Sequence, residues 1–111
     1  MSAEHYWVDV CSIEDLQPDS GICALVENKQ VAIFYMPKEQ AVYAINNYDP
    51  FGKANVLSRG LIGDIDGIAM VASPLYKQHF NLLTGECLED ENVSVEAYAV
   101  RIENSRVEVS I

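Results

Sequence analysis

Few side chains in this sequence of 111 residues could perform chemistry, and their spacing does not form a known catalytic or metal-binding motif. Its two histidines, His5 and His79, are far apart in the chain, and its three cysteines form no Cys-x-x-Cys pair. His79 and Cys87 could meet across a hairpin, but two ligands do not complete a closed metal site. The residue types therefore argue against a His/Cys metal centre.

Nucleophilic catalysis would need Ser73 or Cys87 beside His79, and neither residue lies in a nucleophile-elbow sequence. The glycine-rich patterns that bind phosphates, G-x-G-x-x-G and the Walker loop, are also missing. The cysteines, Cys11, Cys23 and Cys87, each lie in or beside an apolar run. We expect all three to be buried, reduced thiols.

The composition is that of one acidic globular domain. Seven Lys and Arg against seventeen Asp and Glu give a net charge of −10, which disfavours nucleic acids and anionic membranes as partners. Half of the residues are hydrophobic, which is too many for a disordered chain. Because the sequence has neither an apolar run of transmembrane length nor a signal-peptide pattern, we expect a cytoplasmic protein.

Short apolar runs separated by turn residues predict an all-β fold, since no stretch of ten residues keeps a helical period. A capping box over Ser12–Asp15 predicts a single helical turn across residues 13–16. The link 27–30 is expected to join two strands of a meander, and Asn104-Ser105 to close a C-terminal hairpin. The expected strands span residues 6–10, 22–26, 31–36, 41–45, 60–64, 68–72, 79–83, 98–103 and 106–111.

Between these strands, residues 46–57 are rich in Asn, Asp, Pro and Gly without a clear period. We expect a long loop there, and long loops in compact domains are often functional. Asp66-Gly67 is a strong turn signal between two further strands. The acidic run 89–91 is expected to form a solvated loop.

The two loop regions resemble the cluster-binding loops of Rieske domains. Residues 42–51, followed by Leu-Ser-Arg-Gly at 57–60, resemble the first loop, and residues 71–86, with Ser-Pro and Thr-Gly-Glu, resemble the second. In that family, Cys-x-His in the first loop and Cys-x-x-His in the second hold a [2Fe–2S] cluster. The resemblance implies an antiparallel incomplete barrel or sandwich with a smaller, loop-bearing sheet. Residues 1–111 would be one Rieske-like domain, with a degenerate cluster-binding part over 46–90.

This sequence departs from the family at all four ligand positions. Asp49 and Phe51 stand where the first cysteine and histidine would be, and Ser73 and Tyr76 stand at the second pair. Phe has no donor atom, and Ser and Tyr are poor ligands for such an iron. We therefore expect no cofactor and no catalytic residue in this chain.

A Rieske frame without ligands is similar to the small subunits of cytosolic NAD(P)H-dependent nitrite reductases. That resemblance implies a partner large subunit that carries FAD, sirohaem and an iron–sulfur cluster and reduces nitrite to ammonia. This chain would be its accessory subunit. The alternative is a cluster-less binding or regulatory module for another redox partner, whereas a true electron carrier is disfavoured by the missing ligands.

In Rieske proteins the loop tips face the redox partner, so the same tips are the expected docking surface here. Phe51 and Tyr76 could belong to that surface or could instead turn inward and fill the space of the lost cluster. The residues expected to bind the partner are Tyr48, Pro50, Leu75 and Lys77.

Overall fold

Strands form most of the chain, as the apolar alternation predicts. The computed structural model describes residues 6–75 and 77–111, and its only helices within them are single 3-10 turns. These turns are η1 (Ile13–Asp15), η2 (Pro37–Glu39) and η3 (Leu57–Arg59). The strands are β1 (Trp7–Ser12), β2 (Ser20–Val26), β3 (Lys29–Met36), β4 (Ala41–Asn46), β5 (Tyr48–Asp49), β6 (Ala54–Asn55), β7 (Leu61–Ile65), β8 (Ile68–Ala72), β9 (His79–Asn81), β10 (Ala97–Glu103) and β11 (Arg106–Ser110).

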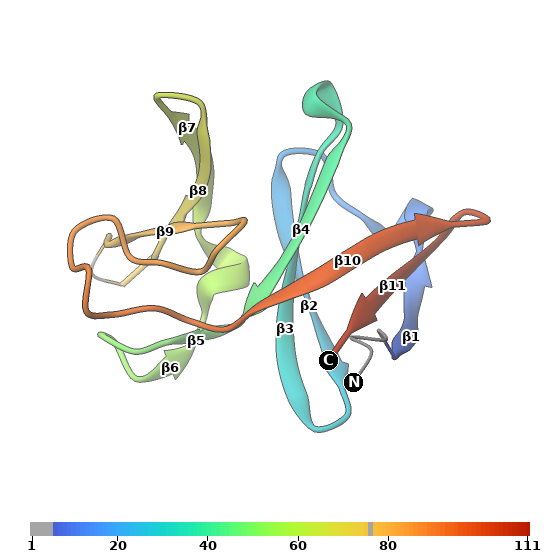
Figure 1. Cartoon of the computed structure of the whole chain (residues 1–111), viewed down its shortest axis with the longest axis horizontal. Coiled ribbons are helices and arrows are strands. Elements are labelled where there is room, and N and C mark those ends of the chain that lie inside the picture. The colour runs from blue at the N-terminus through green and yellow to red at the C-terminus, as the bar shows by residue number, and fades with distance from the viewer. Residues whose placement is uncertain (1–5, 76) are drawn as a thin grey trace, which may run out of the picture.

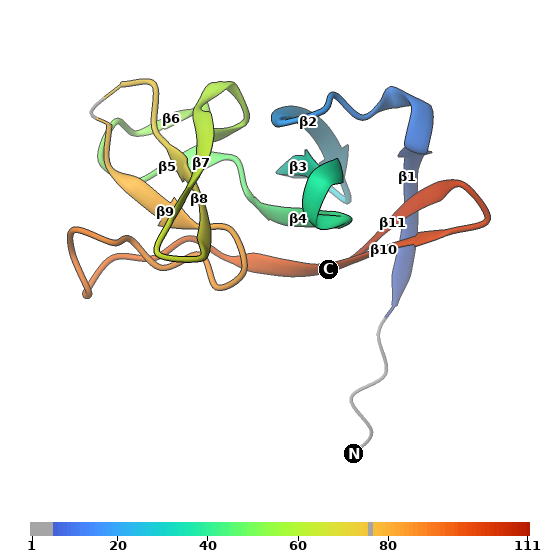
Figure 2. The ribbon, with the colours of Figure 1, turned by 90° about the horizontal axis from the view of Figure 1, so that it is seen from above.

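Three layers follow one another across the molecule (Figures 1 and 2). The β2–β3–β4 meander lies in the middle, with β1, β11 and β10 on one side and the small sheets of β5–β9 on the other. Only two residue pairs, Ala97–Ile45 and Tyr98–Ala44, join β10 to β4. This short junction lets the six-stranded sheet, ordered β1-β11-β10-β4-β3-β2, curl into an incomplete barrel.

Two-residue turns connect β2 to β3, β7 to β8 and β10 to β11. Glu27 and Asn28 both have positive φ, the conformation of a tight hairpin turn whose twist matches the strands. The predicted link 27–30 is therefore too long, because Lys29 and Gln30 already belong to β3. The turns at 66–67 and 104–105 lie where the sequence predicts them.

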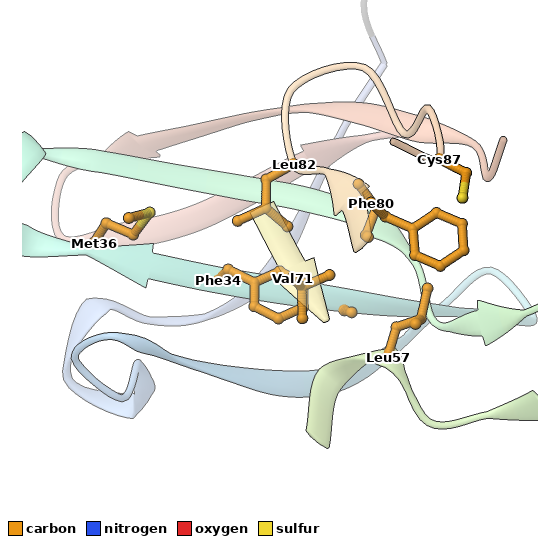
Figure 3. Close-up of a cluster of buried hydrophobic side chains, with 9 residues drawn as sticks. Phe34, Met36, Leu57, Val71, Phe80, Leu82 and Cys87 are labelled. Carbon is orange, nitrogen blue, oxygen red and sulfur yellow. The ribbon is translucent and has the colours of Figure 1, made fainter. Parts of the chain in front are cut away.

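Strand β3 is buried on both faces and supplies two hydrophobic cores. Val31 and Ile33 face one side, while Ala32 and Phe34 face the other, and all four are at most 1% exposed. The first group belongs to the base core, made of Leu16, Val26, Val31, Ile33, Ala44, Tyr98, Val107 and Val109. The second belongs to the loop-side core (Figure 3), made of Ala32, Phe34, Met36, Ile45, Leu57, Val71, Phe80, Leu82 and Cys87.

The loop-side core attaches residues 46–90 to the barrel. Phe34 and Met36 come from β3, while Leu57, Val71 and Phe80 come from η3, β8 and β9 (Figure 3). The region expected to be an irregular loop over 46–57 contains the short β5–β6 ladder, and β7-β8-β9 form a separate sheet. The predicted strand 79–83 is shorter than expected, since β9 ends at Asn81.

The capping box is confirmed. The Ser12 hydroxyl accepts the Glu14 N–H at 3.2 Å, and the Ser12 N–H donates to the Asp15 carboxylate at 3.0 Å. The resulting turn, η1, spans Ile13–Asp15.

The prediction of three buried thiols is wrong for two of them. Cys87 is buried, but Cys11 is only half-buried and Cys23 is exposed. Because strand side chains alternate, Ile22 and Ala24 face the base core and Cys23 points to the other side of β2. All three thiols are free in the structure.

Gly60 places η3 against β8 at a separation that no side chain tolerates. A Cβ atom built there would lie 2.2 Å from the Ala72 carbonyl oxygen. We predict that Gly60→Ala lowers the free energy of unfolding by about 1–3 kcal/mol, because the backbone must shift.

Gly63→Ala in β7 is the matched control, since nothing lies within 4 Å of its added Cβ. Urea unfolding measures both variants. A Gly60→Ala variant as stable as Gly63→Ala would contradict this account of the η3–β8 contact.

Candidate functional site

The two loops meet at a buried hydrogen bond between Asp49 and Ser73. Asp49 in β5 is 0% exposed, and Ser73, which follows β8, is 1% exposed. The Ser73 hydroxyl donates to Asp49 Oδ2. The positions at which the Rieske pattern has its two cysteines are thus in direct contact through oxygen atoms.

Each of these side chains also closes its own loop. Asp49 Oδ1 accepts the Phe51 N–H at 2.9 Å, and Ser73 Oγ accepts the Leu75 N–H at 3.2 Å. Main-chain bonds complete the turns, because the Lys53 N–H donates to the Asp49 carbonyl and the Lys77 N–H to the Ser73 carbonyl. The Asp49–Ser73 bond therefore joins two turns that are already fixed locally.

Asn47 holds the start of the first loop, a role that sequence reasoning missed. Its side chain is 2% exposed, and its Oδ1 accepts the Ser58 N–H at 2.7 Å. Its Nδ2 donates to Gln30 Oε1 at 3.2 Å and lies 3.4 Å from Cys23 Sγ. The sequence signal was an asparagine directly after an apolar strand, where a buried amide needs several partners.

Phe51 turns inward. It packs against the loop-side core, and its ring centroid lies 6.2 Å from that of Phe80. Tyr76 lies outside the described residues. Phe51 therefore fills space between the first loop and β9.

The residues expected to bind a partner differ in exposure. Tyr48 is 41% exposed and Leu75 is 47% exposed, Lys77 is also exposed, and Pro50 is half-buried. Leu75 covers Gly52, whose added Cβ would approach its side chain to 2.4 Å. Three of the four side chains are thus open to a partner.

A second set of polar contacts joins β9 to the acidic run 89–91, which was expected to form a solvated loop. Glu89 accepts the His79 N–H at 2.7 Å and contacts His79 Nδ1 at 2.5 Å. Partial burial opposes ionisation of Glu89, but these two bonds outweigh it and hold the pKa of its carboxyl below the usual range. Glu89 is thus a structural acceptor as well as an exposed charge.

These contacts do not form a nucleophilic site. The Ser73 hydroxyl donates to Asp49 and not to His79. The Cys87 thiol lies 3.7 Å from Glu89, and burial raises its pKa. Such a thiol is largely protonated at neutral pH and is a poor nucleophile.

The donor set does not fit a Rieske cluster. Such a cluster needs two thiolates and two imidazoles, whereas Asp49 and Ser73 are bonded to each other and Phe51 offers no donor. Within residues 6–75 and 77–111, no group of three His, Cys, Asp or Glu side chains could hold a metal ion. None of the helices in these ranges has the length and apolar character needed to cross a membrane.

Comparison with known proteins places this arrangement in a family. The model of the Rieske-like [2Fe-2S] domain family matches residues 6–110. A protein of Escherichia coli K12 named nitrite reductase (NADH) small subunit is 48% identical over 103 residues, which cover 93% of this chain and 95% of the relative.

Two further matches extend this similarity. The solution structure of a nitrite reductase small subunit from Erwinia carotovora superposes with a TM-score of 0.79 at 48% identity, over 95% of this chain and 81% of that one. A Klebsiella oxytoca protein named nitrite reductase large subunit is 39% identical over 101 residues, which are 91% of this chain and 10% of that protein.

We predict that Ser73→Ala destabilises the fold by about 1–3 kcal/mol, because the buried Asp49 carboxylate loses its hydroxyl donor. Urea unfolding measures the change, and Ser94→Ala at an exposed serine is the control, expected within about 0.5 kcal/mol of wild type.

A double-mutant cycle with Asp49→Ala then isolates the bond. The double variant should lose less stability than the sum of the single variants. Additive losses would mean that Asp49 and Ser73 are not coupled.

Proposed function

Because the chain belongs to the nitrite reductase small subunits of the Rieske-like domain family, we propose that it is the accessory small subunit of an NAD(P)H-dependent nitrite reductase. The observation that carries this proposal is the match to a small subunit along nearly the full length of both chains. The partner would be the large subunit, and both would work in the cytoplasm.

The Klebsiella relative supports a close association with the large subunit. In that protein, a segment similar to almost all of this chain makes up a tenth of a chain named as a large subunit. A domain of this kind can thus belong to the same polypeptide as the large subunit, which favours direct contact where the two are separate chains.

In the proposed complex, this chain performs no redox step. The large subunit would carry FAD, sirohaem and an iron–sulfur cluster and would reduce nitrite to ammonia. Two observations favour a role without redox chemistry. Asp49 and Ser73 are bonded to each other and the Phe51 ring turns inward, so three of the ligand positions hold groups that are unsuited to iron.

Residues 46–90 are, in this proposal, a degenerate cluster-binding part set into the β base of one domain. The shared loop-side core supports this view, because it contains side chains from both β3 and the 46–90 region. The fold would have kept its loops after losing the cluster, with hydrogen bonds and an aromatic ring in place of metal coordination.

The first test is anaerobic reconstitution with iron and sulfide, followed by iron and acid-labile sulfide analysis. We predict no stoichiometric uptake, since no thiolate or imidazole stands at a ligand position. A Rieske ferredoxin treated in parallel is the control. Uptake of a cluster per chain would contradict the proposal.

The second test concerns docking through the loop tips. We predict that Tyr48→Ala weakens binding to the large subunit by about 30-fold, the size expected for an exposed aromatic anchor. Calorimetry or copurification measures the affinity, and melting temperatures check the fold.

Ile102→Ala in β10 is the matched control, because Ile102 is 39% exposed and lies near the β10–β11 turn, on the opposite side of the molecule from β5 (Figure 1). Unchanged affinity for Tyr48→Ala would move the interface to another face. Absence of any complex with wild type would favour the alternative of a module for another redox partner.

A further inference from the structure

A cavity of about 350 Å³ lies beside the loop tips and has a mixed lining. Arg59 comes from the end of η3, and Lys77 and His79 come from the second loop and β9. Leu61 and Pro74 supply apolar walls. We call this cavity the cationic pocket, and its size falls in the range of small ligand sites.

The two strongest cations of the pocket have no carboxylate partner within the described residues. Among the five other Lys and Arg residues, three are held in ion pairs at 3.4 Å or closer, namely Lys29 with Glu96, Arg101 with Glu108 and Arg106 with Asp9. Lys38 and Lys53 also have no ion pair within the described residues, but neither lines the pocket. In a chain of net charge −10, Arg59 and Lys77 remain unneutralised at one cavity. Their charge is therefore available to an anionic ligand.

The backbone holds both cations at defined positions. The Arg59 N–H donates to the Val56 carbonyl at 2.9 Å, and the preceding Ser58 N–H is bound by Asn47. The Lys77 N–H donates to the Ser73 carbonyl at 3.1 Å. A site on a fixed backbone has less conformational entropy to lose when it binds.

His79 contributes less to the anion preference. Its Nδ1 is already bonded to the Glu89 carboxylate, so the imidazole is not free to pair with a second anion through that nitrogen. The charge argument therefore depends on Arg59 and Lys77.

We propose that the cationic pocket binds the carboxylate of an acidic side chain on the large subunit. A guanidinium presents paired donors that match a carboxylate, and a partner that covers the exposed Leu61 and Pro74 would exclude water from that bond. Leu61, at the rim, is 80% exposed. An exposed leucine beside an arginine suits a protein partner better than a free anion, which would leave the leucine in water.

The cationic pocket adjoins the loop tips that are expected to bind the large subunit, because Lys77 belongs to both. This inference rests on the proposed accessory function. The pocket adds a requirement for negative charge on the partner's side of that interface. Because the chain as a whole repels an acidic partner, the attraction must be local to the pocket.

The test measures affinity for the large subunit after charge reversal at the pocket. Arg59→Glu and Lys77→Glu should each weaken binding about tenfold or more, and the loss should shrink at high salt. Lys38→Glu is the matched control, because Lys38 is exposed on η2 and does not line the pocket.

Folding is checked by melting temperature, and Arg59→Gln and Lys77→Gln serve as milder variants with the same direction of change. If wild type binds and the pocket variants bind equally well, the pocket proposal is overturned while the accessory function stands. If wild type does not bind the large subunit at all, the accessory function fails and the proposal with it.

A second arm separates a protein carboxylate from a free anion. Acetate and phosphate are titrated into the isolated chain while the amide resonances of Arg59 and Lys77 are followed. Weak, non-saturating shifts agree with the proposal. Saturable submillimolar binding, together with unchanged affinity of the variants for the large subunit, would make this a small-anion site and overturn it.

Discussion

The hydrogen bond between Ser73 and Asp49 holds together the two loops whose tips carry Tyr48, Leu75 and Lys77. We call this side of the molecule the loop face. The bond joins β5 to the turn after β8, and both partners are buried. A buried carboxylate is costly unless it is fully bonded, and Asp49 meets that cost with the Ser73 hydroxyl and the Phe51 N–H. In a Rieske domain, iron would connect these two positions. Here a bond between oxygen atoms links the two loops directly.

Packing against β3 holds the loop region that contains this bond. The strand contributes Phe34 to the loop-side core and Ile33 to the base core, so the barrel and the loop region share one buried element. Asn47 extends this support to the first loop, because its amide group binds both Gln30 and the Ser58 N–H. Packing and hydrogen bonds with the barrel therefore fix the position of the loops.

The distribution of charge gives the loop face its proposed role. The chain as a whole carries a net charge of −10. Arg59 and Lys77 nevertheless line one cavity without a carboxylate partner among the described residues. Exposed Tyr48 and Leu75 lie on the same loops. An interface that combines apolar anchors with local positive charge would select an acidic, partly apolar surface on the large subunit and would orient it.

The sequence by itself determined the local features of this protein and showed that neither Cys nor His stands at the four cluster-ligand positions. Turn residues such as Asn104-Ser105 and the alternation along β10 and β11 act over a few residues, so the hairpins could be predicted. The missing cysteines and histidines were equally visible. Only the tertiary structure decided that Asp49 and Ser73, 24 residues apart, are bonded, and that Arg59 and Lys77 line one cavity. It also decided that Cys23 is exposed. Such contacts depend on how distant strands pack, and spacing along the chain carries no information about that distance.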